Sequence, residues 1–508
     1  MNKAGPRQWF GLSILLLPTV LLFLAMTVLF LATPQIAADL DPSGSQLLWI
    51  NDIYGFMMAG LLVAFGTVGD RIGRRKILLF GAAAFGVASL AASLAPNADL
   101  LIAARAVMGV GAAAVMPSTL SLISNMFKDD KQRGTAIGLW AASISVGVAV
   151  GPLVGGLLLE AFWWGAALLA GVPVMLVVLV GAPFLIPEYR APKSGGLDLP
   201  SVLLSMLTLL PIVYGVKELA KSGAGVVSLG TLAAGLLFGV IFVRRQLRLE
   251  NPLLDMRLFA NKVFSGALGV FMLSAIALGG VYLLFTQYLQ LVAGLSPLEA
   301  GLWILPAALV LVAVSTLSPV LARKVRPAYV ISGGALLSVL GYLLMTQVGS
   351  VAGLPMLITG FYVLYPGIAP AMALNTALVI GSAPPEKAGA ASAVNTTASD
   401  LGTSLGVAVL GTVGTAVYRA AMPAGAPDTL SGALVAAEDM SGQAGAALAA
   451  AARAAYTDGL NVAGGIAAAL VAGAIVLALT TLRKVPATRH SQAAEPEPAT
   501  ERKEVVAA

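Results

Sequence analysis

Three ionisable side chains, two well inside long apolar stretches and one near the end of such a stretch, are the residues of this sequence best placed to do chemistry. They are Asp52, Arg105 and Asp400. A carboxyl group inside a membrane can bind a proton when it faces one side and release it when it faces the other, because burial favours the neutral form. An arginine inside a span is costly and is functional by default. These three residues are therefore the first candidates for a proton or ion site.

Several other chemistries are excluded or not supported. The chain has no cysteine, which excludes disulfides, iron–sulfur clusters and cysteine-based zinc sites. Its single histidine, His490, lies in a polar tail, so we expect no metal site. No GxxxxGK[ST] loop is present, which excludes an ATP-driven pump in a single chain. We find no paired acids or nucleophile–base set and expect neither an enzyme nor a cofactor.

The composition indicates whether this chain folds in water or in a membrane. Of 508 residues, 58% are hydrophobic and 11% are charged, against about 25% charged in an ordinary soluble domain. So few charges could not cover the surface of a soluble protein of this length. This excludes a soluble enzyme, a disordered protein and a nucleic-acid binder. The net charge of +6 comes from basic residues in short loops between apolar runs, so we expect an all-α polytopic membrane protein.

A membrane-spanning helix needs about 20 apolar residues, and the sequence predicts fourteen such helices. Their approximate ranges are 10–31, 47–68, 77–95, 99–122, 135–158, 165–186, 199–218, 226–243, 264–290, 298–321, 328–347, 352–380, 388–418 and 460–482. The first of these lacks a small-residue cleavage site and is followed by many further spans, so we do not expect a removable signal peptide.

The basic residues predict the orientation. If the N-terminus is cytoplasmic, nearly all of the 30 lysines and arginines fall on the cytoplasmic side. The exceptions are Arg105, which lies within a span, and four residues on the outer side: Lys217, Lys221, Arg419 and Arg453. This asymmetry is typical of the positive-inside rule, and it places both termini in the cytoplasm.

The spans follow a six, two and six arrangement. Residues 1–190 are expected to form a six-helix bundle, 191–262 a linker with two extra helices, 263–482 a second six-helix bundle, and 483–508 a disordered cytoplasmic tail. The second bundle includes an outer loop, 419–459, rich in alanine and glycine. A short amphipathic hairpin and a loosely ordered loop are equally compatible with that composition.

Three segments carry motifs at specific places. The loop 66–76 reads GTVGDRIGRRK, residues 101–111 read LIAARAVMGVG, and residues 147–156 read GVAVGPLVGG. In the loop, glycines around Asp70 allow a tight turn, and Asp70 is placed to pair with a basic side chain or to cap a helix. In the third segment, small residues at spacings of about four let another helix approach closely, and Pro152 kinks the chain. That face suits either a helix pair that slides or a static packing seam.

Together the three segments resemble the signatures of the major facilitator superfamily: the loop between helices two and three, the arginine motif of helix four, and the antiporter motif of helix five. Fourteen spans resemble its drug:proton antiporter branch. The strings LWINDIY (48–54), MPSTLSLI (116–123), and QYLQL (287–291) before GLSP (294–297) resemble the bacterial quaternary-ammonium and dye multidrug exporters. The resemblance covers about residues 8–482. Its conformational motifs fall on Gly66, Gly69, Asp70, Arg71, Gly73, Arg74, Arg75, Gly147, Gly151, Pro152, Gly155 and Gly156.

The chain departs from these exporters at two acidic positions. They carry an acid in helix one a few residues before a threonine, where this chain has Ala25 before Thr27. Their helix thirteen often carries an earlier acid, where this chain has Asn395. Both changes remove negative charge from the expected cavity. Proton coupling and substrate binding would then depend on Asp400, Asp52 and Arg105, with Asn395 beside them.

Methionine and aromatic side chains make adaptable surfaces for varied lipophilic ligands. For any one of them lipid contact or helix packing is the more common role, but together they fit a multidrug pocket. The candidates for the substrate cavity are Trp49, Tyr54, Met57, Met58, Met116, Phe285, Gln287, Tyr288, Gln290, Trp303, Tyr362, Tyr365 and Asn375.

The resemblance implies a secondary-active exporter of lipophilic, cationic or neutral drugs in exchange for protons. It implies two six-helix bundles with the site between them, in a monomer spanning a bacterial inner membrane, with no nucleic-acid partner. A dedicated exporter of one antibiotic, metabolite or lipid is the main alternative. A transporter-like scaffold that no longer cycles is a further one.

Overall fold

The computed structural model describes residues 4–190, 198–249, 252, 254–383, 388–423, 425–440 and 442–487, and these residues contain helices and no strand. Most of the predicted linker (191–197) and most of the predicted tail (488–508, with His490) lie outside the described residues. The helices follow the apolar runs, and polar residues cap several of their starts. Ser43, Asn97 and Asp129 each accept a hydrogen bond from a backbone N–H in the first turn of the helix that follows.

The first group of helices runs up to Leu185. Its members are α1 (Pro6–Leu40), α2 (Gly44–Ile72), α3 (Arg74–Ser93), α4 (Ala98–Met126), α5 (Asp130–Ala161), α6 (Trp164–Leu169) and α7 (Gly171–Leu185). The sixth predicted span is divided into α6 and α7 at Ala170. Pro173 lacks the N–H that would bind the Leu169 carbonyl, which accounts for the break.

The second group runs from Lys262 to Thr481. Its members are α10 (Lys262–Gln287), the π-helix η2 (Tyr288–Val292), α11 (Pro297–Leu321), α12 (Pro327–Met345), α13 (Leu354–Gly381), α14 (Ala388–Ala421), α15 (Leu430–Glu438) and α16 (Gln443–Thr481). The two extra helices, α8 (Leu199–Ser222) and α9 (Val226–Arg248), and the 3₁₀-helix η1 (Met256–Ala260) connect the groups.

The prediction of fourteen membrane-spanning helices is confirmed for the described residues. Thirteen stretches are long and apolar enough to span, and α2 adds a fourteenth span that bends by 51° between its parts Gly44–Leu62 and Ala64–Ile72. The prediction for the last span was too short, because α16 begins at Gln443 and not near residue 460. The added turns are rich in alanine, which has the highest helix propensity, so the helix continues beyond the apolar run.

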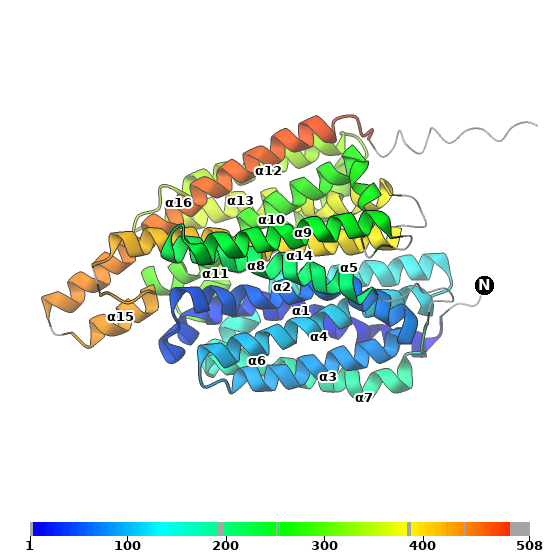
Figure 1. The fold of residues 1–508 in the computed structure, drawn as a ribbon, viewed down its shortest axis with the longest axis horizontal. Coiled ribbons are helices and arrows are strands. Elements are labelled where there is room, and N and C mark those ends of the chain that lie inside the picture. Colours follow the sequence, from blue (N-terminus) through cyan, green and yellow to red (C-terminus); the bar gives the residue numbers. More distant parts are fainter. Residues whose placement is uncertain are drawn as a thin grey trace, which may run out of the picture.

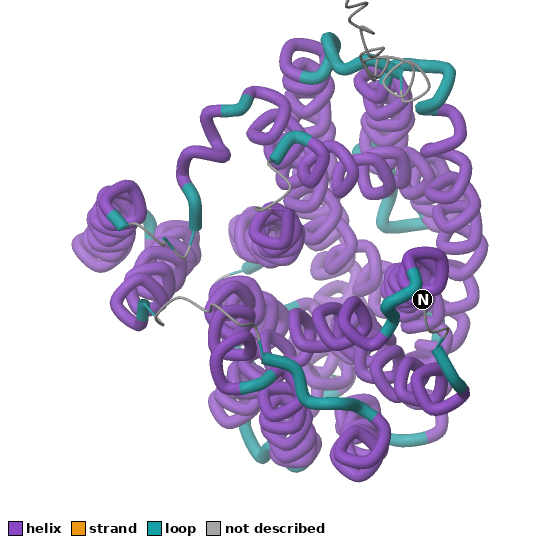
Figure 2. The backbone as a smooth tube through the Cα atoms, turned by 90° about the vertical axis from the view of Figure 1, so that its right-hand side faces the viewer, coloured by secondary structure: helices purple, strands orange, loops and turns teal. Residues whose placement is uncertain are grey.

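The two groups form two bundles that lie side by side. In Figure 1, α1–α7 make up the lower bundle and α10–α14 with α16 the upper one, while α8 and α9 lie in front of the boundary between them. Seen along the long axis, the pair α8 and α9 stands to the left, outside both bundles (Figure 2). α8 contacts α2 of the first bundle and α14 of the second.

The outer loop contains regular structure. α15 packs against α16 and α1, and the Ser431 hydroxyl donates a hydrogen bond to the Pro34 carbonyl oxygen at 3.1 Å. The Tyr418 hydroxyl, at the end of α14, donates to the Thr429 carbonyl oxygen at 3.3 Å. Of the two alternatives for segment 419–459, the helical one describes it: α15 and the start of α16 form the end of the molecule drawn at the left of Figure 1.

Candidate functional site

Arg105 is fully buried between α4 and α2, at 0% exposure. Its Nε donates to the Ile50 carbonyl oxygen at 3.3 Å, and its guanidinium carbon lies 4.6 Å from the centre of the Tyr54 ring, a cation–π geometry. Asp52 is close enough to act on Arg105 electrostatically. Among the described residues, Nη1 and Nη2 of Arg105 have no hydrogen-bond partner. The guanidinium is thus held by charge and by the ring face more than by hydrogen bonds.

Gly109 explains how α2 and α4 come close enough for this arrangement. A Cβ atom at Gly109 would lie 2.6 Å from the Tyr54 carbonyl oxygen and 2.7 Å from the Met57 Cβ. Tyr54 and Met57 therefore pack against α4 inside the first bundle, and the Tyr54 ring also meets Phe85 edge to face. Both were expected to line the substrate cavity, and these contacts are with α3 and α4 of their own bundle.

Asp400 lies on α14, where that helix packs against α2. It is 4% exposed, and its Oδ2 accepts no hydrogen bond from the part of the chain that the structure describes. The two helices approach closely at Gly55, where a Cβ atom would lie 2.0 Å from the Ser404 hydroxyl. Asp400 also acts electrostatically on Tyr54. Arg105 of α4 and Asp400 of α14 thus both act on Tyr54 of α2, while Asp52 of α2 acts on Arg105.

Asn395 joins α14 to α13 through neutral hydrogen bonds. Asn375 Nδ2 donates to Asn395 Oδ1, and Asn395 Nδ2 donates to Thr376 Oγ1 at 3.0 Å. Both asparagines are buried. Position 395, where the resemblance led us to look for a second acid, is therefore occupied by an amide that is hydrogen-bonded to Asn375 and Thr376 and carries no charge.

An aromatic cluster occupies the boundary between α10 and α13. The rings of Phe285 and Phe361 stack at 4.1 Å, and those of Phe361 and Tyr365 at 4.7 Å. Tyr282 lies beside all three and meets Phe30 of α1 edge to face at 5.4 Å. Of these four residues, only Phe285 and Tyr365 were expected in the cavity from the sequence. The spacing of Tyr282 before Phe285, and of Phe361 before Tyr365, was the signal that could have added their partners, because residues three or four apart share a helix face.

The remaining cavity candidates are spread over several surfaces. Gln290 donates to the Leu31 carbonyl oxygen of α1, Tyr288 to that of Gly349, and Tyr362 to that of Trp303.

Gln287 lines a small cavity of about 40 Å³ at the outer loop, together with Leu48, Gly411, Tyr418, Asp428 and Tyr456. Met58 and Met116 are buried, Trp49 packs edge to face on Phe56, and the Trp303 side chain is 42% exposed. The contacts of these candidates thus lie at several places in the described part of the chain.

The loop between α2 and α3 is held within the first bundle. Asp70 pairs with Arg74 at 2.7 Å, so its expected basic partner comes from the same loop. The backbone N–H of Arg75 donates to Glu188 Oε1 at 2.9 Å. Gly73 has φ of +129°, and a Cβ there would lie 2.7 Å from the Glu188 carboxylate. Only glycine suits this position, for both its conformation and its space.

The glycines of α5 pack on two different neighbours. Cβ atoms at Gly147, Gly151 and Gly155 would meet Val20, Thr27 and Val28 of α1, in the same bundle. A Cβ at Gly156 would instead lie 2.7 Å from the Pro297 carbonyl oxygen of α11, in the other bundle. The first three form a packing seam within a bundle. Gly156 alone of the four lies at the boundary that must change if the bundles rock.

The bundles contact each other in the half of the molecule near α15. Between α2 and α14, Gly44 lies at Thr415, Leu48 at Gly411, and Gly55 at Ser404. Between α5 and α11, the Pro152 carbonyl oxygen would lie 2.4 Å from a Cβ at Gly301. These contacts close that end around the buried acids.

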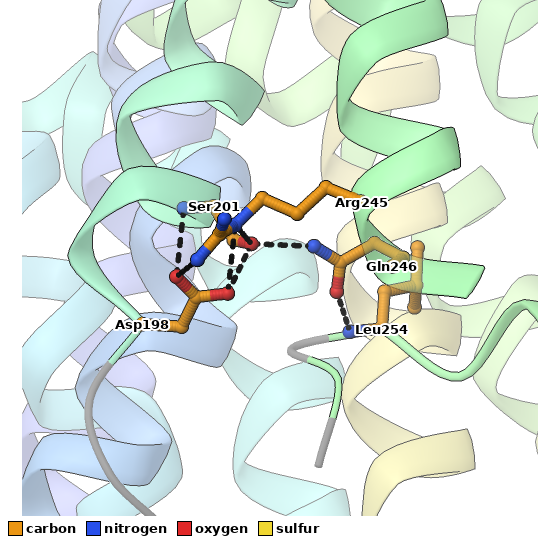
Figure 3. A network of polar contacts seen from close by, with 5 residues as sticks. All are labelled: Asp198, Ser201, Arg245, Gln246 and Leu254. Atoms are coloured by element: carbon orange, nitrogen blue, oxygen red, sulfur yellow. Dashed lines mark hydrogen bonds and ion pairs between the residues drawn. The ribbon is translucent and has the colours of Figure 1, made fainter. Parts of the chain in front are cut away.

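A polar network fastens α8 to α9 at the ends of these helices opposite α15 (Figure 3). Arg245 Nη2 binds Asp198 Oδ1 at 2.7 Å, and Gln246 Nε2 donates to the Ser201 hydroxyl. Gln246 Oε1 accepts from the Leu254 N–H at 3.0 Å. Burial opposes ionisation of Asp198, yet hydrogen bonds from Arg245 and Ser201 outweigh it and lower the pKa of that carboxyl below its ordinary value.

Comparisons with known proteins agree with this geometry. Residues 15–407 match the Major Facilitator Superfamily. The multidrug efflux pump LfrA of Mycolicibacterium smegmatis is 41% identical over 95% of this chain and 98% of its own length. The methyl viologen resistance protein SmvA of Salmonella typhimurium is 37% identical over 82% of this chain and 85% of its own. A bacterial homologue of the human lysosomal transporter Spinster, in an inward-facing and unoccupied conformation, superposes with a TM-score of 0.66 at 18% identity over 95% of this chain and 99% of its own.

Proposed function

This chain belongs to the Major Facilitator Superfamily, and on that premise we propose that it exports lipophilic cationic or neutral drugs in exchange for protons. It is a multi-pass membrane transporter and not an enzyme, and its relatives are named as drug efflux or resistance proteins. The observation that supports proton coupling is Asp400, a buried carboxyl at the boundary between the bundles whose Oδ2 has no hydrogen-bond partner among the described residues.

The orientation and the conformational state follow from the same proposal. With both termini cytoplasmic, as the positive-inside rule favours, the end near α15 is the outer end. The bundle contacts at Gly55, Gly156 and Gly301 then close the outer side, so that this conformation is an inward-facing one. We place the chain as a monomer in the bacterial inner membrane, with residues 1–190 and 263–482 as the moving bundles and residues 191–262 between them.

The chemistry of exchange rests on alternation at Asp400. In the outward-facing state a proton from outside neutralises the carboxyl, and the rocking of the bundles carries it inward. Loss of the proton to the cytoplasm leaves a negative charge that favours a cationic substrate nearby. Arg105 and Asp52 keep their mutual attraction inside the first bundle, so the charge that changes is the one on the second bundle. Substrate and proton therefore compete for one buried region.

Energised efflux from cells tests the proposal. Cells that express the chain should accumulate less ethidium than cells with empty vector, and a protonophore should remove the difference. Equal accumulation with and without the chain would point to the scaffold alternative. A panel of unrelated compounds separates multidrug export from dedicated export; puromycin belongs in it, since a puromycin resistance protein of Streptomyces alboniger is 37% identical over 82% of this chain and 83% of its own.

Charge selectivity should follow from Ala25. This residue is 6% exposed in an apolar cluster that contains residues of both bundles, and Asn395 is neutral, so a second positive charge on a substrate lacks a buried partner. We expect efflux of the monocation ethidium to exceed efflux of the dication methyl viologen. Ala25→Asp should raise methyl viologen efflux selectively, by about tenfold for 1.4 kcal/mol of added attraction.

Ala25→Asn, which adds a side chain of the same size without charge, is the control for this change. SmvA is named for methyl viologen resistance, so the opposite outcome is a real alternative. If the native chain moves both compounds equally well, Asp52 or Asp400 already serves the second charge, and Ala25 is only a packing position.

A further inference from the structure

The helix α8 covers the seam between α2 and α14 from outside the bundles. Phe56 of α2, Val213 of α8 and Ala408 of α14 form a buried apolar cluster in which each is at most 1% exposed. Trp49 and Leu210 pack against it from α2 and α8, while Leu401 and Leu405 do so from α14. Phe56 follows Gly55, and Leu401 follows Asp400. The cluster therefore lies directly beside the candidate coupling site, on the side that would otherwise face lipid.

A second contact ties α8 to α2 where α2 bends. A Cβ atom at Gly60 would lie 1.6 Å from the Met206 Cε and 3.7 Å from Leu209 Cδ1. The Met206 side chain thus occupies the space that the missing side chain of Gly60 leaves open. The bend of 51° in α2 follows within three residues, after Leu62. On α14 the apolar cluster that includes Val213 of α8 contains Ala408, with Leu401 and Leu405 packed against it.

The remaining surface of the α8–α9 pair suits contact with lipid. α9 contacts α8 closely, as at Gly235, where a Cβ would lie 2.6 Å from Ile212 Cγ1. Its large apolar residues are widely exposed, as at Leu236 and Leu237. The Asp198–Arg245 and Ser201–Gln246 contacts fasten the two helices at one end (Figure 3). α8 and α9 therefore form one stiff unit that rests on the bundles through α8.

We propose that α8 is the lipid-side wall of the coupling site: Met206 anchors it to α2, and Val213 seals the region of Asp400 against lipid while α14 slides past. This inference rests on the proposed function, because a wall is needed where a buried acid must exchange protons with one side at a time. It makes Met206 and Val213 positioning residues. α2 and α14 must separate at their outer halves when the transporter opens outward, and α8 cannot keep all its contacts with both.

Because this chain has no cysteine, a thiol cross-linker can join only the two cysteines that each variant introduces. One variant carries Gly60→Cys with Met206→Cys, to join α8 to α2; another carries Val213→Cys with Ala408→Cys, to join α8 to α14. The control carries Thr208→Cys with Gly239→Cys, which lie together within the α8–α9 pair, since a Cβ at Gly239 would be 3.1 Å from Thr208 Cγ2. Ethidium efflux is measured in each before and after a short thiol cross-linker.

We expect the α8–α2 and α8–α9 cross-links to leave efflux within about twofold of the untreated variants, and the α8–α14 cross-link to reduce it to the vector background. Arrest by the α8–α2 cross-link would overturn the anchoring of α8 to α2. Full activity with α8 joined to α14 would overturn the sliding contact.

A second measurement tests the wall without relying on transport. Ala408→Cys, reconstituted in liposomes, should react with a lipid-dissolved maleimide at least about tenfold more slowly than Leu237→Cys, because a covered site reacts only on local opening. Adding Val213→Gly should raise the rate at position 408 and leave that at 237 unchanged. Equal rates for the two single variants would refute the wall, even in a chain that transports normally. If the unsubstituted chain gives no ethidium efflux while position 408 is still protected, the proposed function fails and the wall stands.

Discussion

Asp400→Asn should reduce energised ethidium efflux to the level of empty vector while the amount of protein in the membrane stays unchanged. The substitution keeps the size of the side chain and removes its ability to bind and release a proton. The Asp400 Oδ2 accepts no hydrogen bond in the described part of the chain, so the amide disturbs no existing contact there. The loss should therefore come from coupling and not from folding, which drug accumulation and membrane immunoblots measure together.

Asp439→Asn is the matched control, because Asp439 is an exposed acid of the outer loop, and it should leave efflux unchanged. A protonophore should make no further difference in Asp400→Asn cells. Unchanged efflux by Asp400→Asn would remove this residue from the mechanism and leave Asp52 as the acid to test. Downhill exchange of ethidium in vesicles without a proton gradient should survive in the variant, since the binding region keeps its shape.

Gly156→Ala should slow turnover without lowering the amount of folded protein, whereas Gly147→Ala should lower the amount. Added Cβ atoms would meet backbone at both positions: Pro297 O at 2.7 Å from Gly156, and Val20 O at 2.5 Å from Gly147. Overpacking of this kind costs about 1–3 kcal/mol. At Gly156 the clash exists only while α5 and α11 are closed on each other, so it disfavours one conformation; at Gly147 it lies inside one bundle and disfavours folding itself.

A free-energy change of that size shifts the equilibrium constant between two conformations by about 5- to 150-fold. The efflux rate per folded molecule measures this shift. Fluorescence-detected size exclusion gives the folded amount for both variants. Parallel losses of turnover and folded protein in Gly156→Ala would contradict a role at a moving boundary. Gly138→Ala serves as the control, because a Cβ at that position of α5 would meet nothing within 4 Å.

The sequence alone established the membrane fold and its helix number. Lipid cannot hydrogen-bond the backbone, so each span must be a long apolar helix, and such helices are visible as uninterrupted runs without any knowledge of contacts. The motif at 66–76 left two roles open for Asp70, a pair with a basic side chain or a helix cap, and the structure has it paired with Arg74. The start of the last helix, at Gln443 and not near residue 460, was missed because alanine extends helices beyond the apolar run.

Tertiary structure decided which side chains meet. Arg105 and Asp400 are far from Tyr54 in the sequence, and their approach to it depends on how closely α2 approaches α4 at Gly109 and α14 at Gly55. The two extra helices had no expected role, and only packing shows Met206 and Val213 of α8 beside that site. Apolar periodicity reports that a helix face is covered but not what covers it, because the same side chains suit lipid, a neighbouring helix or a drug.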